Sequence, residues 1–293
     1  MTPSDRPDSG SAGSEGSGIY TGPVERYGEV DRTPDPSAFV RHLETAGRSP
    51  TVRAQKATSY AFLDPQPGDR VLDVGCGLGD DVRALAARVG PGGRVVGVDV
   101  SETMLATART QSAGLGLPVE FRAGDAHRLA FPDGSFDRVR CERVLEHLAE
   151  PLRAFAELVR VTRPGGTLVV INSDAGTYAL DHPDPERTRA VLLVMGARHA
   201  HPWMGRQLYG LFRAAGLTEL QLAAQTHFIR RLDTSDQGTV YQAARQAVAQ
   251  GVLTPDEAAA WLAPLEEADR AGRFLSTGTH FIVGGQKPVP PAP

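Results

Sequence analysis

The chain has little lysine and no surplus of positive charge. Its 293 residues carry a formal net charge of −4, and lysine occurs only at Lys56 and Lys287. Proteins that bind nucleic acid usually present a basic stripe to the phosphates, whereas arginine is scattered here among slightly more numerous acids. The charge pattern therefore argues against a nucleic acid as the partner.

Cysteine and long apolar runs are also scarce. Cys76 and Cys141 are the only cysteines and form no CxxC pair, so neither a disulfide scaffold nor a bound metal ion is expected. No run of eighteen apolar residues occurs, and the N-terminus lacks a basic region followed by an apolar core. We expect a cytoplasmic protein without membrane insertion, either a monomer or a homodimer.

Composition divides the chain into segments. Residues 1–18 are rich in Ser, Gly and Pro, which predicts a disordered leader. Apolar residues at helical spacing up to Phe62, with a break at Ser49-Pro50, predict two helices in an N-terminal lid of residues 19–64. The main domain is expected over residues 65–285, and the Pro-rich residues 286–293 form a loose tail.

Strand and helix patterns alternate through the main domain. Expected strands cover residues 70–74, 94–100, 119–123, 136–141, 167–172, 219–228 and 279–285, and expected helices cover 80–89, 102–113 and 151–161. Strands separated by such helices imply right-handed crossovers, so we predict an α/β fold with a Rossmann-like, doubly wound, mainly parallel sheet. The stretch 173–217 is longer than a crossover needs and is interpreted as a substrate-lid insertion, and 237–272 as a helical insertion.

The segment VLDVGCGLG brings three glycines directly after the first expected strand. Gly75, Gly77 and Gly79 allow a tight turn and let a ligand approach the backbone amides. Dinucleotide folds usually show GxGxxG, whereas this spacing is GxGxG. Asp73, inside the strand, would repel a phosphate and attract an ammonium group.

Acidic residues also follow the next two strands. Asp99, with Val100 beside it, stands where a carboxylate can accept hydrogen bonds from two ribose hydroxyls. Asp125 can accept from an adenine amino group, and the amide of Ala126 can meet a ring nitrogen. Met104, one helical turn beyond Asp99, is placed to lie on an adenine face, or to be plain core packing.

Five sequence elements occur in one order between Gly68 and Asn172: VLDVGCGLG, VVGVDVS, GDAHRLAFPDGSFDRV, LEHL and RPGGTLVV. Together they resemble the class I S-adenosylmethionine-dependent methyltransferases, in particular the ubiquinone and menaquinone branch and bacterial natural-product enzymes. The resemblance implies S-adenosylmethionine as cofactor. It also implies a seven-stranded sheet whose last strand is antiparallel.

The resemblance further implies which residues hold the cofactor. The methionine part would lie against the glycine loop, the ribose against Asp99 and the adenine against Asp125; the implied set is Tyr27, Asp73, Gly75, Cys76, Gly77, Asp99, Val100, Met104, Asp125, Ala126, Cys141 and His147. Cys141 would contribute its carbonyl, and His147 would cover the cofactor or be an exposed helix residue. The Cys76 sulfur is interpreted as a small packed group.

The acceptor is expected to be a small molecule, such as an aromatic secondary metabolite methylated at oxygen or carbon. The Asn/Asp-Pro-Pro-aromatic and Pro-Cys motifs of nucleic-acid methylation are absent. A proton must leave such an acceptor, and a histidine has a suitable pKa to take it. The candidate bases are His182, His199, His201, His227 and His280. His182 is preferred, assisted by Tyr20. A surface histidine held by Asp181 or Asp184 is the competing interpretation of His182.

Two other functions remain open at this point. An NAD-dependent oxidoreductase is disfavoured by the GxGxG spacing and by Asp73. A cyclase or a scaffold that keeps the cofactor pocket without methyl transfer has no sequence feature against it.

Overall fold

A computed structural model describes residues 24–233 and 238–290 of the chain. The expected leader and Tyr20 lie outside these residues, and so does the side chain of Tyr27. None of the helices described is both long enough and apolar enough to cross a membrane.

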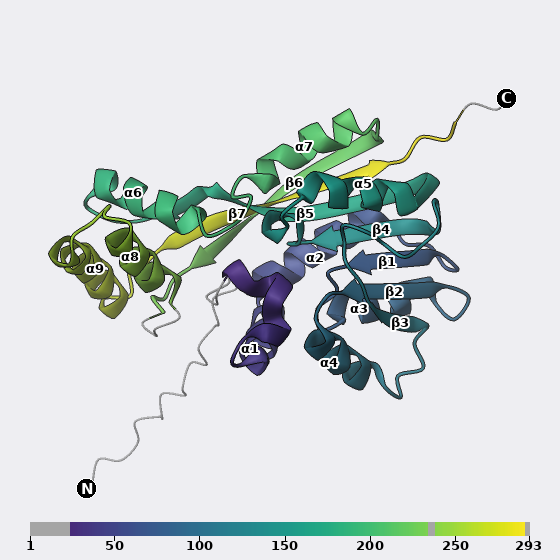
Figure 1. Cartoon of the computed structure of the whole chain (residues 1–293), viewed down its shortest axis with the longest axis horizontal. Helices are drawn as coiled ribbons and strands as arrows, with labels where there is room; N and C mark the ends of the chain where they lie inside the picture. Colours follow the sequence, from purple (N-terminus) through teal and green to yellow (C-terminus); the bar gives the residue numbers. More distant parts are fainter. Residues whose placement is uncertain (1–23, 234–237, 291–293) are drawn as a thin grey trace, which may run out of the picture.

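A seven-stranded sheet runs through the molecule in the order β3-β2-β1-β4-β5-β7-β6 (Figure 1). The strands are β1 (Arg70–Val74), β2 (Arg94–Asp99), β3 (Val119–Ala123), β4 (Phe136–Glu142), β5 (Thr162–Leu180), β6 (Thr218–Ile229) and β7 (Ser276–Gln286). The pairs among β1 to β5 are parallel, and β7 is antiparallel to both β5 and β6. The predicted α/β fold with an antiparallel last strand is confirmed.

Helices cover both faces of this sheet. They are α1 (Pro36–Gly47), α2 (Pro50–Leu63), α3 (Asp80–Val89), α4 (Glu102–Ser112), α5 (Pro151–Val161), α6 (Pro185–Gly196), α7 (Met204–Ala214), α8 (Thr239–Ala249) and α9 (Pro255–Arg270), with the 3₁₀ helices η1 (Val24–Arg32) and η2 (Leu145–His147). One buried cluster joins α2 and α3 to the sheet, and another joins α5 and α7 to the opposite face.

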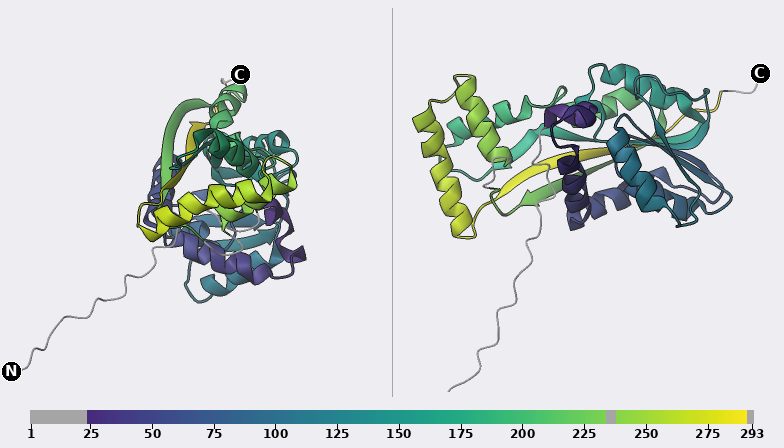
Figure 2. Two further views of the ribbon diagram at one scale, coloured as in Figure 1. Left: turned by 90° about the vertical axis from the view of Figure 1, so that its left-hand side faces the viewer. Right: turned by 60° about the horizontal axis from the view of Figure 1, so that its bottom comes forward.

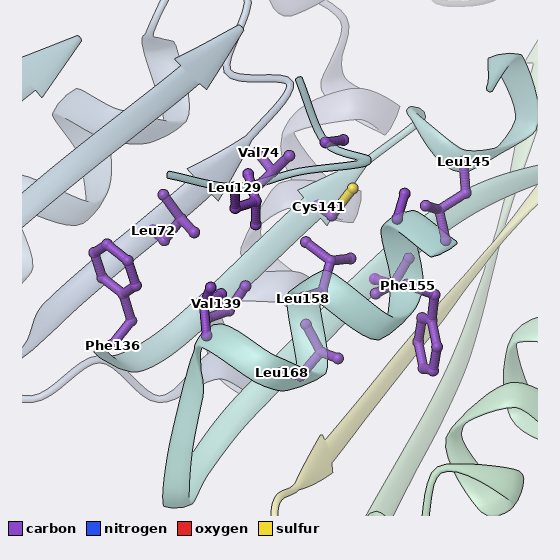
Figure 3. Close-up of a cluster of buried hydrophobic side chains, with 14 of the residues drawn as sticks. Leu72, Val74, Leu129, Phe136, Val139, Cys141, Leu145, Phe155, Leu158 and Leu168 are labelled. Atoms are coloured by element: carbon purple, nitrogen blue, oxygen red, sulfur yellow. The ribbon is translucent and has the colours of Figure 1, made fainter. Parts of the chain in front are cut away.

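The core on the α5 side is built from alternate residues of the strands. Figure 3 shows Leu72 of β1 and Val139 of β4 on the side of the sheet that carries Leu158 of α5. All three side chains are fully buried. Because side chains of a strand alternate between faces, the intervening Val71 packs into the other cluster. This two-sided burial explains why β1 reads as a continuous apolar run broken only by Asp73.

β5 extends further than the sequence predicts. Residues Ser173 to Leu180, which the sequence analysis placed in a lid, continue the strand. They pair with β7 at both ends of this stretch, on either side of an irregularity between Asp174 and Ala179. Their polar character is typical of a loop, but Asp174 is buried and accepts hydrogen bonds from the Nε and Nη2 atoms of Arg206 at 2.5 and 2.6 Å. A partner 32 residues away in sequence therefore lets a polar segment remain a strand.

The long ends of β5, β6 and β7 carry a helical lobe made of α6, α8 and α9. Figures 1 and 2 show this lobe at the opposite end of the molecule from β1, β2 and β3. It has its own buried cluster around Trp261, whose indole nitrogen donates to the Thr188 hydroxyl at 3.0 Å. The helical pattern expected at 237–272 is thus present as α8 and α9, within the part of that segment the structure describes.

A buried ion cluster ties the first strands to the N-terminal helices. Arg140 of β4 is 1% exposed and donates from Nη1 to Asp73 of β1 at 3.0 Å. It also pairs with Glu142 and, at 3.4 Å, with Asp81 of α3. Lys56 of α2 binds Asp81 at 2.7 Å. Arg143 lies 3.8 Å from Glu142 as well, so three carboxylates and three cations meet beneath the glycine loop.

Removing Arg140 should destabilise the fold strongly. Arg140→Ala would leave the buried carboxylate of Asp73 without its cationic partner, and breaking a buried ion pair costs about 3–5 kcal/mol in comparable cases. Urea unfolding should show this loss, whereas Arg109→Ala, which removes an exposed ion pair with Glu102, should change stability by less than about 0.5 kcal/mol. Equal stability of the two variants would contradict a structural role for the cluster.

Candidate cofactor and acceptor site

The glycine loop between β1 and α3 requires its glycines. Gly75, Gly77 and Gly79 have φ values of 74°, 50° and 73°, a left-handed region that other residues enter only with strain. A Cβ on Gly75 would also collide with Val144. The amides of Gly75 and Cys76 both donate to the Val98 carbonyl, at 2.7 and 3.0 Å, which fixes the turn against β2.

Asp99 lies at the carboxyl end of β2 and links two loops. Its Oδ2 accepts from the amide of Gly77 at 2.8 Å, and its Oδ1 accepts from the amide of Ser101 at 3.0 Å. Burial raises the pKa of Asp99, and these backbone donors oppose that rise. The carboxylate is thus oriented before any ligand arrives, with its remaining lone pairs available at the cavity wall.

A cavity of about 190 Å³, open to solvent on one side, follows this edge of the sheet. Its lining includes eight of the predicted contacts, namely Gly75, Gly77, Asp99, Val100, Met104, Asp125, Ala126 and His147. The structure therefore brings together most of the cofactor set implied by the resemblance.

Three other predicted cofactor residues lie behind this wall. Asp73 is buried and paired with Arg140. The Cys76 sulfur packs so closely on Gly97 that a Cβ there would lie 2.8 Å from it, in keeping with a packed role. Burial raises the pKa of the Cys76 thiol well above its usual value, which makes it a poor nucleophile. Cys141 is likewise buried.

The structure places His182 in the helical lobe instead of the cavity wall. Its ring stacks on Trp261 with centroids 5.5 Å apart, and its Nε2 lies 2.9 Å from the Trp261 carbonyl. The amide of Asp184 donates to its Nδ1 at 2.9 Å. Both ring nitrogens thus have structural partners, so the position of His182 supports the competing interpretation of a histidine held by its own loop.

The far end of the cavity contains a group of histidines that the sequence analysis did not assemble. We call this end the histidine chamber; its lining residues are His147, Ser173, Tyr178, His199 and His280. They come from η2, the β5 extension, the loop after α6 and β7, which are separate in sequence. Only their shared position at one sheet edge connects them.

Glu146 is the fixed negative charge of this chamber. Its Oε2 accepts from the Ser173 amide at 2.7 Å and from Asn172 at 3.1 Å, and its Oε1 lies 3.4 Å from Nε2 of His147. Burial alone would raise the pKa of Glu146, but His147, His199 and Ser173 hold it well below its usual range. Glu146 is therefore ionised, and it belongs to the LEHL element whose acid the sequence analysis did not use.

The N-terminal segment closes the other end. Gly28 and Val30 of η1 line the cavity, and Val30 packs with Phe39 and Met104. Asp31 accepts from the Ser101 hydroxyl and the Glu102 amide, both at 2.7 Å. A carboxylate at the start of α4 is favoured by the helix dipole, so this contact holds η1 over the cofactor region.

Comparison with known proteins gives a family match for the central part of the chain and one relative that matches most of its length. Residues 72–170 match the model of the methyltransferase domain family. An uncharacterized 37.1 kDa protein in a Streptomyces fradiae transposon is 36% identical over 254 residues, which cover 84% of this chain and 71% of that protein.

Relatives with a named activity match a shorter part. A ubiquinone/menaquinone biosynthesis C-methyltransferase of Bordetella parapertussis is 41% identical over 119 residues, covering 41% of this chain and 46% of the relative. A demethylmenaquinone methyltransferase of Bacillus cytotoxicus is 36% identical over 126 residues, covering 43% and 53%. The match spans about half the length of these enzymes.

Solved structures share the fold. A putative methyltransferase from Bacillus halodurans aligns with a TM-score of 0.55 at 22% identity, over 80% of this chain and all of that one. The (4+2)-cyclase SpnF aligns with a TM-score of 0.50 at 23% identity, over 81% of each chain. At these identities the likeness concerns the fold alone.

Removing the Asp99 carboxylate should weaken cofactor binding. Asp99→Ala loses two hydrogen bonds from ribose hydroxyls to a charged acceptor, and we expect a cost on the order of 2 to 4 kcal/mol in calorimetric affinity for S-adenosylhomocysteine. Asp99→Asn, which can still accept from one loop amide, should fall between this variant and wild type. Undiminished affinity in a folded Asp99→Ala protein would rule out the ribose contact.

The buried histidines should make the fold sensitive to acid. Burial lowers the pKa of His42, His199 and His227 to about 4, below the unfolded value of 6.5. Between these two pH values the unfolded state binds more protons, so stability falls as pH falls, by on the order of 1 kcal/mol per pH unit for each histidine.

His227 offers a direct measurement of this effect. Its Nε2 lies 3.0 Å from Oε1 of Gln55, a contact that the amide of a His227→Gln variant can imitate without titrating. Urea unfolding of both proteins at pH 7, 6 and 5 should show a shallower loss of stability in the variant. Parallel curves would mean that His227 titrates alike in the folded and unfolded states.

Proposed function

The chain belongs to the class I S-adenosylmethionine-dependent methyltransferases, and we propose that it methylates a small aromatic molecule bound in the histidine chamber. It is an enzyme with S-adenosylmethionine as its cofactor. Because the family uses this cofactor, the NAD-dependent oxidoreductase considered from the sequence is set aside.

The residues at the carboxyl edge of the sheet fit this cofactor. The glycine loop leaves a cradle that a Cβ on Gly75 would disturb, Asp99 presents an oriented carboxylate, and Asp125 and Ala126 line the cavity after β3. When bound, the cofactor supplies a methyl group already activated by a sulfonium.

The observation that carries the proposal is the continuity of the cavity. The same space contacts Asp125 and Ala126 at one end and Tyr178 and His199 at the other, so cofactor and acceptor can meet within it. Imidazole and phenol rings with Val144 and Leu148 form a wall suited to a flat aromatic acceptor. Two relatives are named as a ubiquinone/menaquinone biosynthesis C-methyltransferase and a demethylmenaquinone methyltransferase, and these names support a small-molecule acceptor.

The residues of the chain contribute mainly position and exclusion of water. Methyl transfer from a sulfonium needs the nucleophile in line at roughly 3 Å, so a held acceptor reacts faster than a free one. Residues 24–63 act as the lid on the cofactor side, and the β5 extension with the helical lobe bounds the acceptor side. The sequence predicts both an N-terminal lid and a substrate-lid insertion, and we assign each of them to one end of the cavity.

Incubation with methyl-labelled cofactor and fractionated metabolite extracts tests the proposal. We expect label in a small aromatic product, reduced at least tenfold in Asp99→Ala at limiting cofactor. Label in nucleic acid or protein would contradict a small-molecule acceptor. If S-adenosylhomocysteine binds but no fraction acquires label, the cyclase or scaffold alternative replaces methyl transfer.

A further inference from the structure

Tyr178 and His199 form a pair on the wall of the histidine chamber. The Tyr178 hydroxyl lies 3.2 Å from Nε2 of His199, and both side chains line the cavity. The Nδ1 atom of His199 is buried and has no hydrogen-bond partner among the described residues. His182 differs, because both of its ring nitrogens have hydrogen-bond partners.

The charges around the pair favour a neutral histidine that can accept one proton. His147 and Arg198 disfavour a positive charge on His199, whereas the Glu146 carboxylate favours it. Around Tyr178, Glu146 and Asp174 raise the pKa of the phenol, and Arg198 and Arg143 lower it. Burial lowers the pKa of His199 to about 4 and raises that of Tyr178. Before reaction the pair thus consists of an uncharged phenol and an uncharged imidazole.

We propose that Tyr178 and His199 form a proton relay that receives the proton of a hydroxyl acceptor during methyl transfer. This inference rests on the proposed function and adds the acceptor class, a phenol or alcohol, and the residues that take its proton.

The step balances in atoms and charge. The acceptor oxygen forms a bond to the methyl carbon, and the carbon–sulfur bond breaks with its electron pair remaining on sulfur. The acceptor proton passes to the Tyr178 oxygen, whose own proton passes to Nε2 of His199. One positive charge is present before the step, on sulfur, and one after it, on the imidazolium; release of that proton to solvent resets the relay.

Because the total charge stays constant during the step, one fixed carboxylate can serve the chamber before and after the reaction. Glu146 is a buried negative charge held by Ser173 and Asn172. It can offset the sulfonium before reaction and the imidazolium afterwards, so no uncompensated charge forms in the low-dielectric space. While the sulfonium is present it disfavours protonation of His199, and that constraint ends when the methyl group leaves.

Nitrogen NMR of imidazole-labelled full-length protein tests the relay without an acceptor. For the relay, the Tyr178 hydroxyl must donate to Nε2, so His199 should be the Nδ1–H tautomer in the complex with S-adenosylhomocysteine. Sinefungin, which carries an amine in place of the methylated sulfonium, should lower the pKa of His199 by about 1 relative to that complex. His182, which lies in the helical lobe, should give the same ring-nitrogen signals in both complexes.

Tyr178→Phe provides the matched variant. It should retain both ligands with unchanged affinity and lose the preference for the Nδ1–H tautomer. A wild-type His199 in the Nε2–H tautomer, or a His199 pKa equal in the two complexes, would overturn the relay. Failure of both ligands to bind would instead refute the proposed function, so the two failures are distinguishable.

Turnover with the acceptor found by the labelled-methyl screen supplies a second readout. His199→Gln and Tyr178→Phe should each lower kcat by about a hundredfold while affinity for S-adenosylhomocysteine stays constant. His182→Gln should keep kcat within about threefold. Loss of turnover in His182→Gln alone would return the role of base to His182.

Discussion

The buried ion cluster around Arg140 is the contact on which the arrangement of the site depends. Arg140 joins β4 to β1 through Asp73, and Asp81 with Lys56 connects α3 to α2. The glycine loop lies between these elements, so its left-handed turns rest on a fixed base. Ions in a protein interior are tolerated only when paired, and the pairing here makes the positions of four elements interdependent.

Asp73 could have either a cofactor-binding or a structural role as judged from the sequence. Its position before the glycines suggested contact with the cofactor, but its side chain binds Arg140 and lies behind the cavity wall. Any attraction that Asp73 exerts on a cationic ligand therefore acts through the net charge of the cluster. Asp99, by contrast, lies at the wall itself and orients the loop through the Gly77 amide.

The two ends of the cavity differ in how they are built. The cofactor end uses loops that directly follow β1, β2 and β3, so its residues cluster in the sequence. The acceptor end combines η2, the β5 extension, the loop after α6 and β7, and its buried acid Glu146 is satisfied by Ser173 and Asn172. Changes in the long strands or the helical lobe can therefore alter the acceptor end without altering the cofactor end.

The strand and helix periods of the sequence predicted the mainly parallel sheet, because these periods are local signals. The antiparallel last strand and the set of cofactor residues followed from the family resemblance of the five sequence elements. The sequence did not reveal that Ser173 to Leu180 form a strand, since the polar residues there find partners such as Arg206 only after folding. It also preferred His182 among the candidate histidines. His182 follows β5 closely but is held by Trp261, whereas His199 reaches Tyr178 across 21 residues. Proximity between distant segments arises from packing, and packing alone decided which histidine lies beside the cavity.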